Sequence, residues 1–417
     1  MTTTQEVKTN IISDNKSVSL TRSLVESLAP QVRLTDSDGT LDLFCYVKCS
    51  PDDSDLIKNC RGVVFQGDKL VLQSFPYTME YTDQQVDLVK QVCGDFSTCS
   101  VLESYEGALI RVFNRNGKWY VSTHRKLDAF HSKWASRESF GEILEKALKT
   151  NWTTAPPNEE NVLNTFLTTL NPDNQYMFLV LNTNENRIVC QAPKQPTVYH
   201  VGTTLEDGKW IFDDNVGIPQ PRKFNFQSVD ELLTYVKNVD FEFLQGVIVF
   251  TQDGNHFKVL NNTYKDFFEL RGNEPSIKFR YLQIRKDPKK TDLLYKRYPN
   301  SINQFDEYEN ILYEIANRIY KRYESQYIKR LDQEFPMMPH HEYQIMIGCH
   351  KWHQEDKKSN RVSLRKVIEV MNEKDPHILN QLIRGKKEEE KEIRRIQNPT
   401  TTQTPNKPKR MLLPLQN

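Results

Sequence analysis

The chain has 417 residues, of which 37% are hydrophobic and 27% are charged, and its formal net charge is +1. This length is enough for two domains with buried cores, and the sequence contains no window of about eighteen apolar residues, which excludes a membrane-spanning helix. Seven cysteines without regular spacing argue for free thiols in a reducing compartment, so we expect a cytoplasmic protein.

The N-terminal two thirds of the chain have the pattern of a β-rich domain. Residues 1–20 are polar and lack any periodicity, which predicts a flexible lead-in. From Leu41 onward, short runs rich in β-branched and aromatic residues predict strands, and the turn Asn114–Lys118 predicts a hairpin between two of them. Apolar residues at helical spacing predict helices at 139–148, within 152–170 and at 228–236.

After Tyr264 the pattern becomes helical. A broad apolar stripe predicts a long helix at Phe305–Leu331, and its aromatic residues are better explained as packing core than as a platform for stacking bases. Two further helices are expected at 362–371 and 378–396. The segment 398–417, rich in Pro, Thr and Lys, is expected to be disordered alone, with an apolar end that could dock on a partner or simply fray.

The most informative motif lies at residues 103–110, which match the pattern Lys-x-(Asp/Glu)-Gly-x-(Leu/Ile) except that Ser104 stands at the lysine position. In this pattern the lysine amine attacks the α-phosphate of a nucleoside triphosphate, and a serine hydroxyl cannot form the resulting phosphoramidate. Further segments follow the same motif order along the chain: Cys60–Phe65, Ser74–Tyr81, Glu106–Gly107, Asn186–Val189, Gly246–Val249 and Asp253–Lys258.

In this order the segments resemble the adenylylating, ATP-dependent RNA ligases of the bacteriophage tRNA-repair type, within the lysine-nucleotidyltransferase superfamily, over residues 40–265. The resemblance implies an α+β fold: a core of mostly antiparallel sheets with peripheral helices and a nucleotide cleft between two sheets, followed by an all-helical C-terminal domain. We therefore expect a lead-in at 1–20, a ligase-like domain at 21–270, a helical domain at 271–397 and a tail at 398–417.

The resemblance also implies which functional positions are lost. Two cations are replaced, by Ser104 and Leu260, and two carboxylates are replaced, by Val180 and Gln245. Losing only one sign of charge would leave an uncompensated group in the cleft, whereas these losses balance. We therefore expect no catalytic residue, no metal and no cofactor in an inactive, ligase-like protein.

Several matched positions keep residues that could contact a nucleotide or RNA. They are Arg61, Glu106, His124, Arg125 and Lys258. Arg61 is equally well explained as an ion-pair partner at the end of a strand. His124 and Arg125 could simply be solvated residues of a hairpin, and Arg187 is expected to support the fold. Cys349, His350 and His353 form a cluster that zinc could use, but with no fourth ligand nearby a polar loop or helix edge explains them better.

Two alternatives stay open. One is an active ATP-dependent RNA ligase with a displaced nucleophile, which would need ATP and magnesium. The other is a structural or scaffolding protein that binds a protein partner through its C-terminal helices or tail. The resemblance also suggests a large DNA virus as the source, with a viral factory or a virion as further options for localisation. The C-terminal part is basic, with 29 Lys and Arg against 20 Asp and Glu in residues 274–417, and is the region expected to contact RNA.

Overall fold

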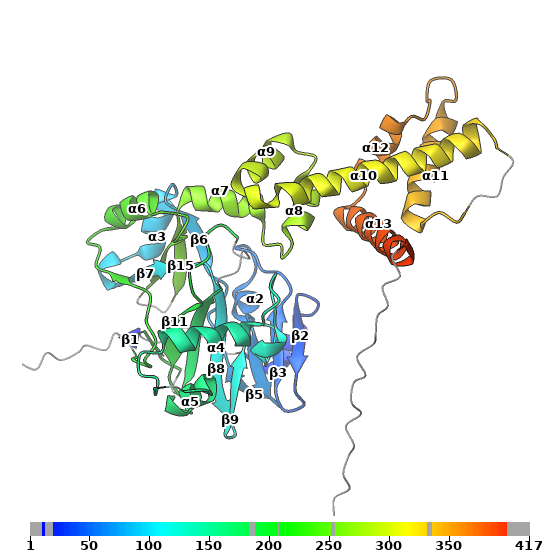
Figure 1. Ribbon diagram of the computed structural model, residues 1–417. Helices are drawn as coiled ribbons and strands as arrows, with labels where there is room; N and C mark the ends of the chain where they lie inside the picture. The colour runs from blue at the N-terminus through cyan, green and yellow to red at the C-terminus, as the bar shows by residue number, and fades with distance from the viewer. Residues whose placement is uncertain are drawn as a thin grey trace, which may run out of the picture. The chain divides into compact units, whose positions relative to one another are not determined.

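The computed structural model describes residues 11–12, 20–157, 159–182, 188–206, 208–212, 214–251, 255–331 and 336–397. By its internal contacts the chain divides into two compact units, Met1–Pro275 and Ser276–Asn417. The first unit contains all the strands of the described residues, and the second is helical (Figure 1). Among the described residues, no helix has the length and apolar character needed to cross a membrane.

The largest sheet of the first unit is six-stranded and antiparallel. Its strands, in spatial order, are β1 (Ile11–Ile12), β12 (Trp210–Ile211), β11 (Thr197–Thr204), β10 (Gln175–Leu181), β8 (Ala108–Arg115) and β9 (Lys118–Ser122). Between β8 and β9, Asn116 and Gly117 have φ values of 53° and 79°, as a tight hairpin turn requires, so the predicted hairpin is confirmed.

Two helices cover one face of this sheet (Figure 1). They are α4 (Phe140–Asn151) and α5 (Val162–Thr169). Helix α4 begins with a capping box, in which the Ser139 side chain and the Glu142 side chain each accept from the other residue's backbone N–H. Leu144 and Phe166 pack on Ile110 and Phe178 of the sheet, which forms the main core.

A second sheet carries the strands that matter most for the site. Its order is β13 (Lys223–Phe224), β7 (Ser100–Ser104), β14 (Gly246–Phe250), β15 (His256–Leu260) and β6 (Met79–Thr82). Helices α3 (Val86–Cys93) and α6 (Val229–Asn238) cover its outer face, where Val247 and Val259 are buried. Because side chains alternate along a strand, Ile248 and Lys258 point to the opposite face. Helix α7 (Asn262–Arg271) follows β15 directly.

The third sheet is four-stranded and antiparallel. It consists of β2 (Val32–Ser37), β3 (Asp42–Tyr46), β4 (Val63–Gln66) and β5 (Lys69–Leu72). One face packs on the six-stranded sheet through Leu43 and Val64 against Phe113 and Met177. The other face carries α1 (Arg22–Ser27) and α2 (Asp55–Asn59), and short 3-10 turns η1 (Phe96–Thr98) and η2 (Ala129–His131) complete the unit.

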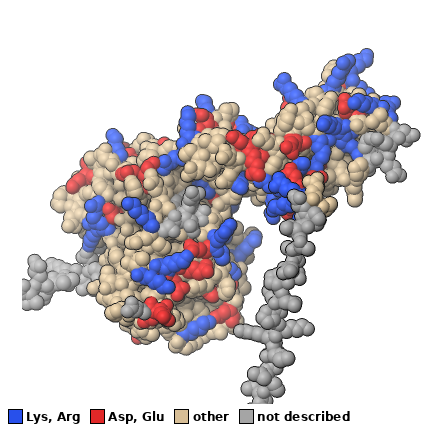
Figure 2. Space-filling view, in the orientation of Figure 1, with Lys and Arg blue, Asp and Glu red and all other residues tan. Residues whose placement is uncertain are grey.

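The second unit consists of helices. They are α8 (Ile277–Ile284), α9 (Pro288–Arg297), the 3-10 turn η3 (Pro299–Ser301), α10 (Ile302–Tyr323), the π-helical turn η4 (Glu324–Ile328), α11 (His340–Glu355), α12 (Leu364–Asn372) and α13 (Pro376–Gln397). Helix α10 contacts α11, α12 and α13, and its Arg318 bonds both Glu342 and Glu389. Many Lys and Arg side chains lie on the visible face of this unit, with Asp and Glu among them (Figure 2).

The expected α+β core of mostly antiparallel sheets, followed by helices, is confirmed. Two details differ. The α-helical part of the long predicted helix ends at Tyr323, before a π-helical turn, and the segment around Cys349 is the 16-residue helix α11. Within α11, Cys349 is buried, His350 stacks on Tyr327, and the His353 ring donates to Asn360 O. The predicted tail at 398–417 and nearly all of the lead-in lie outside the described residues.

Candidate functional site

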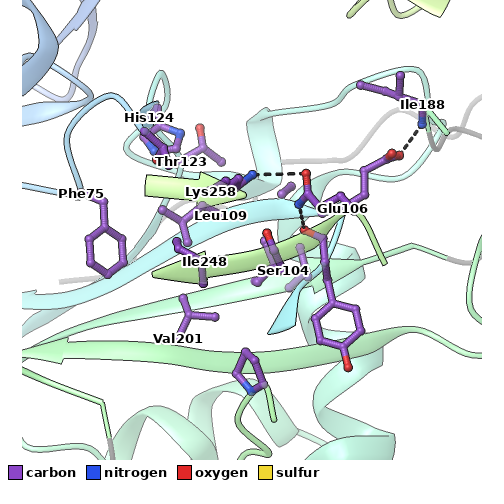
Figure 3. Close-up of a pocket in the computed structure, with 18 of the residues that line it drawn as sticks. Phe75, Ser104, Glu106, Leu109, Thr123, His124, Ile188, Val201, Ile248 and Lys258 are labelled. Carbon is purple, nitrogen blue, oxygen red and sulfur yellow. Dashed lines mark hydrogen bonds between the residues drawn. The ribbon is translucent and has the colours of Figure 1, made fainter. Parts of the chain in front are cut away.

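A cavity of about 640 Å³ lies between the five-stranded and the six-stranded sheets of the first unit. Its walls come from β7, β14 and β15 on one side and from β8, β10 and β11 on the other (Figure 3). Most of the positions singled out by the motif order line it: Arg61, Ser104, Glu106, His124, Arg125, Val180, Gln245 and Lys258. The structure therefore brings together residues that lie nearly 200 positions apart in the sequence.

Ser104 ends strand β7 at the wall of this cavity. It lies opposite Gly246 of β14, its backbone carbonyl accepts from the Gln245 N–H across 3.1 Å, and only 4% of the residue is exposed. Ser104 has a neutral hydroxyl one carbon from the backbone, where the motif has a lysine with its long side chain and terminal amine. At this position the chain has no group that can form a phosphoramidate.

Lys258 places an amine in the same cavity. Its Nζ donates to Gln245 Oε1 across 3.4 Å, and Gln245 Nε2 donates in turn to the Tyr105 carbonyl across 2.5 Å, so three segments are linked in a chain of hydrogen bonds (Figure 3). Burial lowers the pKa of Lys258, while the carboxylates of Glu80 and Glu106 act in the opposite direction. The ammonium therefore faces the cavity with a neutral amide as its bonded partner.

Glu106 also lines the cavity, but its carboxylate is used by the fold. It accepts from the backbone N–H groups of Ile188, of Val189 (2.9 Å) and of Cys190 (3.3 Å), and from the Tyr264 hydroxyl (3.1 Å). Four donors satisfy both oxygens of the carboxylate, so Glu106 holds the segment at 188–190 against α7. Arg187, which precedes that segment, lies outside the described residues.

The other two carboxylates on the cavity wall are compensated as well. Glu80 pairs with Lys265 across 3.1 Å. Glu103 pairs with Arg222 across 3.1 Å and accepts from the Tyr105 hydroxyl across 2.6 Å. Each carboxylate that lines the cavity in the described part of the chain therefore already has a donor or a cation from the chain itself.

The cationic side chains that line the cavity are bonded to neutral groups instead. Arg61 donates to the Pro76 carbonyl (3.3 Å) and to Thr78 Oγ1 (3.4 Å), Arg125 donates to the Val47 carbonyl (3.0 Å), and Lys133 donates to the Arg137 carbonyl (2.6 Å). Within the described part of the chain, none of these three, nor Lys258, forms an ion pair with a carboxylate. The cavity thus has a surplus of uncompensated positive charge, which favours an anionic ligand.

The three histidines that line the cavity in the described residues, His124, His200 and His256, stay neutral near pH 7, because burial lowers the pKa of each. Burial lowers the pKa of His256 to about 3, and the charges of Arg61 and Lys258 add to this effect. Its Nε2 lies 2.9 Å from Thr78 Oγ1. Burial and nearby arginines likewise lower the pKa of His124, and the buried Nε2 of His124 has no hydrogen-bond partner among the described residues.

Arg111 holds two segments of the cavity wall in place through hydrogen bonds. Its side chain is fully buried and donates to the carbonyls of Gly62 and Thr123, the residues next to Arg61 and His124. Burial lowers the pKa of Arg111 to about 9. Gly62 has φ +75°, and a Cβ there would lie 2.6 Å from Arg111 Nη1, so the close approach depends on glycine.

One expected position is not part of the cavity wall. Leu260 was expected beneath Ser104 together with Val180, Gln245 and Lys258, but it is buried in a separate hydrophobic cluster with Val189, Cys190 and Tyr264. The alternation along β15 puts it on the same side as Lys258, and the side chain of Tyr264 on α7 then covers it. Sequence reasoning also missed Thr78, Glu80 and Lys133 as lining residues, of which only Thr78 and Glu80 lay in a recognised motif.

The chain matches no family model. It is 30% identical over 372 residues to the immediate-early protein ICP-46 homolog of Invertebrate iridescent virus 6, covering 83% of this chain and 81% of that protein. The homolog of Invertebrate iridescent virus 3 is 28% identical (64% of this chain, 60% of that protein), and ICP-46 of Frog virus 3 is 25% identical (57% and 62%). Relatives in viruses are thus confirmed.

Among solved structures, the chain is similar to an archaeal ATP-dependent RNA ligase, with a TM-score of 0.40 at 12% identity, covering 69% of this chain and 70% of that one. It is also similar to a Naegleria gruberi RNA ligase with ATP and Mn, with a TM-score of 0.32 at 12% identity, covering 45% and 57%.

Proposed function

The chain belongs to the ICP-46 family of viral immediate-early proteins, and we propose that its first unit is an RNA ligase-like module that binds a phosphate-bearing nucleic acid without becoming adenylylated. The observation that carries this proposal is the charge distribution of the cavity. Among the described residues, Arg61, Lys258 and Lys133 contact only neutral oxygens, whereas every carboxylate on the wall is compensated. We also propose that this module is of the bacteriophage tRNA-repair type of RNA ligase. This assignment rests on the order of the motifs along the sequence.

The cavity offers donors of the kind that phosphate requires. A guanidinium carries five N–H donors in a fork that matches phosphate oxygens, and an ammonium adds a point charge. Arg61 uses one terminal nitrogen for Pro76 and Thr78, which leaves other donors for a ligand. The buried, unpartnered Nε2 of His124 supplies one more polar group at the wall. A terminal phosphate is therefore the ligand that this site fits best.

Ser104 is the reason for proposing binding without covalent chemistry. The motif places a nucleophilic amine at the end of β7, and this chain has a hydroxyl there. We expect that incubation of the full chain with α-labelled ATP and magnesium leaves no covalent label with the acid-labile, alkali-stable character of a lysine phosphoramidate on the protein. The Ser104→Lys variant should also stay unlabelled, because the carboxylates at 180 and 245 would still be missing.

Binding is tested with two RNA oligonucleotides of one sequence, one with a 5′-phosphate and one with a 5′-hydroxyl. The proposal expects the phosphorylated oligonucleotide to bind more tightly, by about tenfold if one charge-assisted contact is lost. Equal affinities for both oligonucleotides would contradict phosphate binding in the cavity.

RNA contacts of the second unit are a further part of this proposal. Such contacts would neutralise phosphates, so the logarithm of the affinity for long RNA should fall linearly with the logarithm of the salt concentration. Apolar docking of a protein partner lacks this dependence. A salt-independent interaction of the helical unit would favour the scaffolding alternative.

Lys258 supports a second candidate function, an active ligase with a displaced nucleophile. Its amine lines the cavity, and burial lowers its pKa, as in lysines that act as nucleophiles. Labelling with α-labelled ATP distinguishes the two functions. Alkali-stable, acid-labile label that disappears in the Lys258→Arg variant would establish the displaced nucleophile and reject the non-covalent proposal.

A further inference from the structure

The ligase resemblance implies a divalent ion beside the transferred phosphate, held by oxygen ligands. The residues of this cavity do not fit such an ion. In the described part of the chain, no group of three or more His, Cys, Asp and Glu side chains is arranged to hold a metal ion. The two motif positions expected to carry acidic groups are Val180 and Gln245, both of which line the cavity.

The three carboxylates that line the cavity in the described ranges already have partners. Glu106 accepts four hydrogen bonds, three of them from backbone N–H groups. Glu103 is paired with Arg222, and Glu80 with Lys265. A divalent ion would have to displace an ammonium, a guanidinium or a set of backbone donors before it could gain a carboxylate ligand.

The amide at 245 is also unsuitable as a metal ligand. Its oxygen accepts from the Lys258 ammonium, and its nitrogen donates to the Tyr105 carbonyl, which fixes the orientation of the side chain. A metal ion at that oxygen would lie beside a lysine ammonium, and the two positive charges would repel each other. The cationic groups of the cavity therefore stand where a metal ion would otherwise act.

We infer that the cavity binds a phosphate monoester directly through Arg61 and Lys258, without a divalent metal ion. The inference rests on the proposed function and specifies how that site recognises its ligand. The two residues lie near each other, because Arg61 Nη1 contacts Thr78, Thr78 contacts His256, and His256 and Lys258 are two apart on β15 and point to the same face. A phosphate dianion placed between them compensates both charges.

The test measures binding of AMP and of a 5′-phosphorylated RNA oligonucleotide to the full chain by calorimetry, once with magnesium and once with EDTA at equal ionic strength. The inference expects dissociation constants that agree within about threefold, the range that residual ionic effects can produce. A larger loss of affinity in EDTA would overturn the inference while leaving the proposed function intact. No binding of either ligand in either buffer would overturn both. Binding of only one ligand identifies the phosphate source.

A matched variant makes the test sharper. In Gln245→Glu, the new carboxylate would pair with Lys258 and create one acidic ligand, so affinity in EDTA should fall by about tenfold and magnesium should restore part of it. Gln245→Met is the control, because it removes the amide without adding charge and should stay indifferent to magnesium. If magnesium raises the affinity of the unchanged chain as much as it raises that of Gln245→Glu, the assignment of direct recognition is wrong.

Discussion

The Tyr264 hydroxyl donates a hydrogen bond to the Glu106 carboxylate across 3.1 Å, although the two residues are 158 positions apart. The same carboxylate accepts three backbone N–H groups at 188–190. A residue that the motif assigns to the nucleotide cleft therefore joins the cavity wall, the 188–190 segment and helix α7.

Replacing Glu106 should reduce stability more than it reduces binding. In Glu106→Gln, the amide group presents a donor to backbone donors, so we expect a loss of about 2–3 kcal/mol in the free energy of unfolding. Tyr264→Phe removes a single bond and should cost about 1 kcal/mol. Urea unfolding measures both values, and Glu160→Gln, at an exposed position, is the control. A Glu106→Gln variant as stable as this control would contradict the structural role.

Lys258 should dominate phosphate affinity. Lys258→Met removes a cation that has no carboxylate partner, so we expect affinity for a 5′-phosphorylated oligonucleotide to fall by about tenfold or more and the salt slope to decrease by about 1. Lys118→Met is the control, because Lys118, which lies on the β8–β9 hairpin, pairs with Asp38 and does not line the cavity. The measurement is fluorescence anisotropy at several salt concentrations. An equal effect of the two substitutions would reject Lys258 as a phosphate contact.

Gly62 allows a comparison in which only steric contact differs. Gly62 and Gly117 have φ values of +75° and +79°, but a Cβ at 117 meets nothing within 4 Å, whereas a Cβ at 62 lies 2.6 Å from Arg111 Nη1 and 2.8 Å from His124 Cα. Gly117→Ala should cost about 1 kcal/mol from backbone strain alone. Gly62→Ala should cost about 3 kcal/mol or more, because Arg111 must also move. Thermal unfolding of both variants checks this difference.

Stability should fall as the pH is lowered from neutral. Burial lowers the pKa of His200 to about 4 and that of His256 to about 3, against about 6.5 for the unfolded chain. Between these values the unfolded chain binds more protons, so the free energy of unfolding rises with pH by up to about 1.4 kcal/mol per unit for each histidine. This contribution is complete above pH of about 6.5 and is lost as the pH falls through the folded values.

Urea unfolding at a series of pH values from about 7 to about 4.5 tests this dependence. The His256→Asn variant should show a flatter curve than the unchanged chain. His131→Asn, whose ring is exposed, should leave the slope as it was. An unaltered slope in His256→Asn would mean that His256 does not titrate as its surroundings imply.

The sequence was most informative where local chemistry determines structure. The positive φ values of Asn116 and Gly117 suit a hairpin, and Ser139 with Glu142 caps a helix, so both elements were predictable. Helix α11 was missed because His340–Glu355 mixes apolar, aromatic and polar residues without a clear apolar stripe. Its helix forms because Ile345, Met346 and Cys349 are buried within the unit.

The site was predictable as a set of positions but not as a set of contacts. The motif order placed Ser104, Gln245 and Lys258 on one cavity wall, since it reports how strands are arranged. It could not show that Glu106 is satisfied by backbone donors at 188–190, because such contacts depend on the folded path of another segment. Lys133 was not predicted as a lining residue, because it lies in a loop that carries no recognisable motif.

The packing of Leu260 restricts what a change of sequence could restore. A lysine at this position would have its ammonium enclosed by Val189, Cys190 and the ring of Tyr264, where only 1% of the present side chain reaches solvent. A Ser104→Lys substitution alone leaves this apolar enclosure untouched, whereas Leu260→Lys alone disrupts it. Placing lysines at both 104 and 260 would therefore also require changes in the residues that enclose Leu260, so no single substitution supplies both amines.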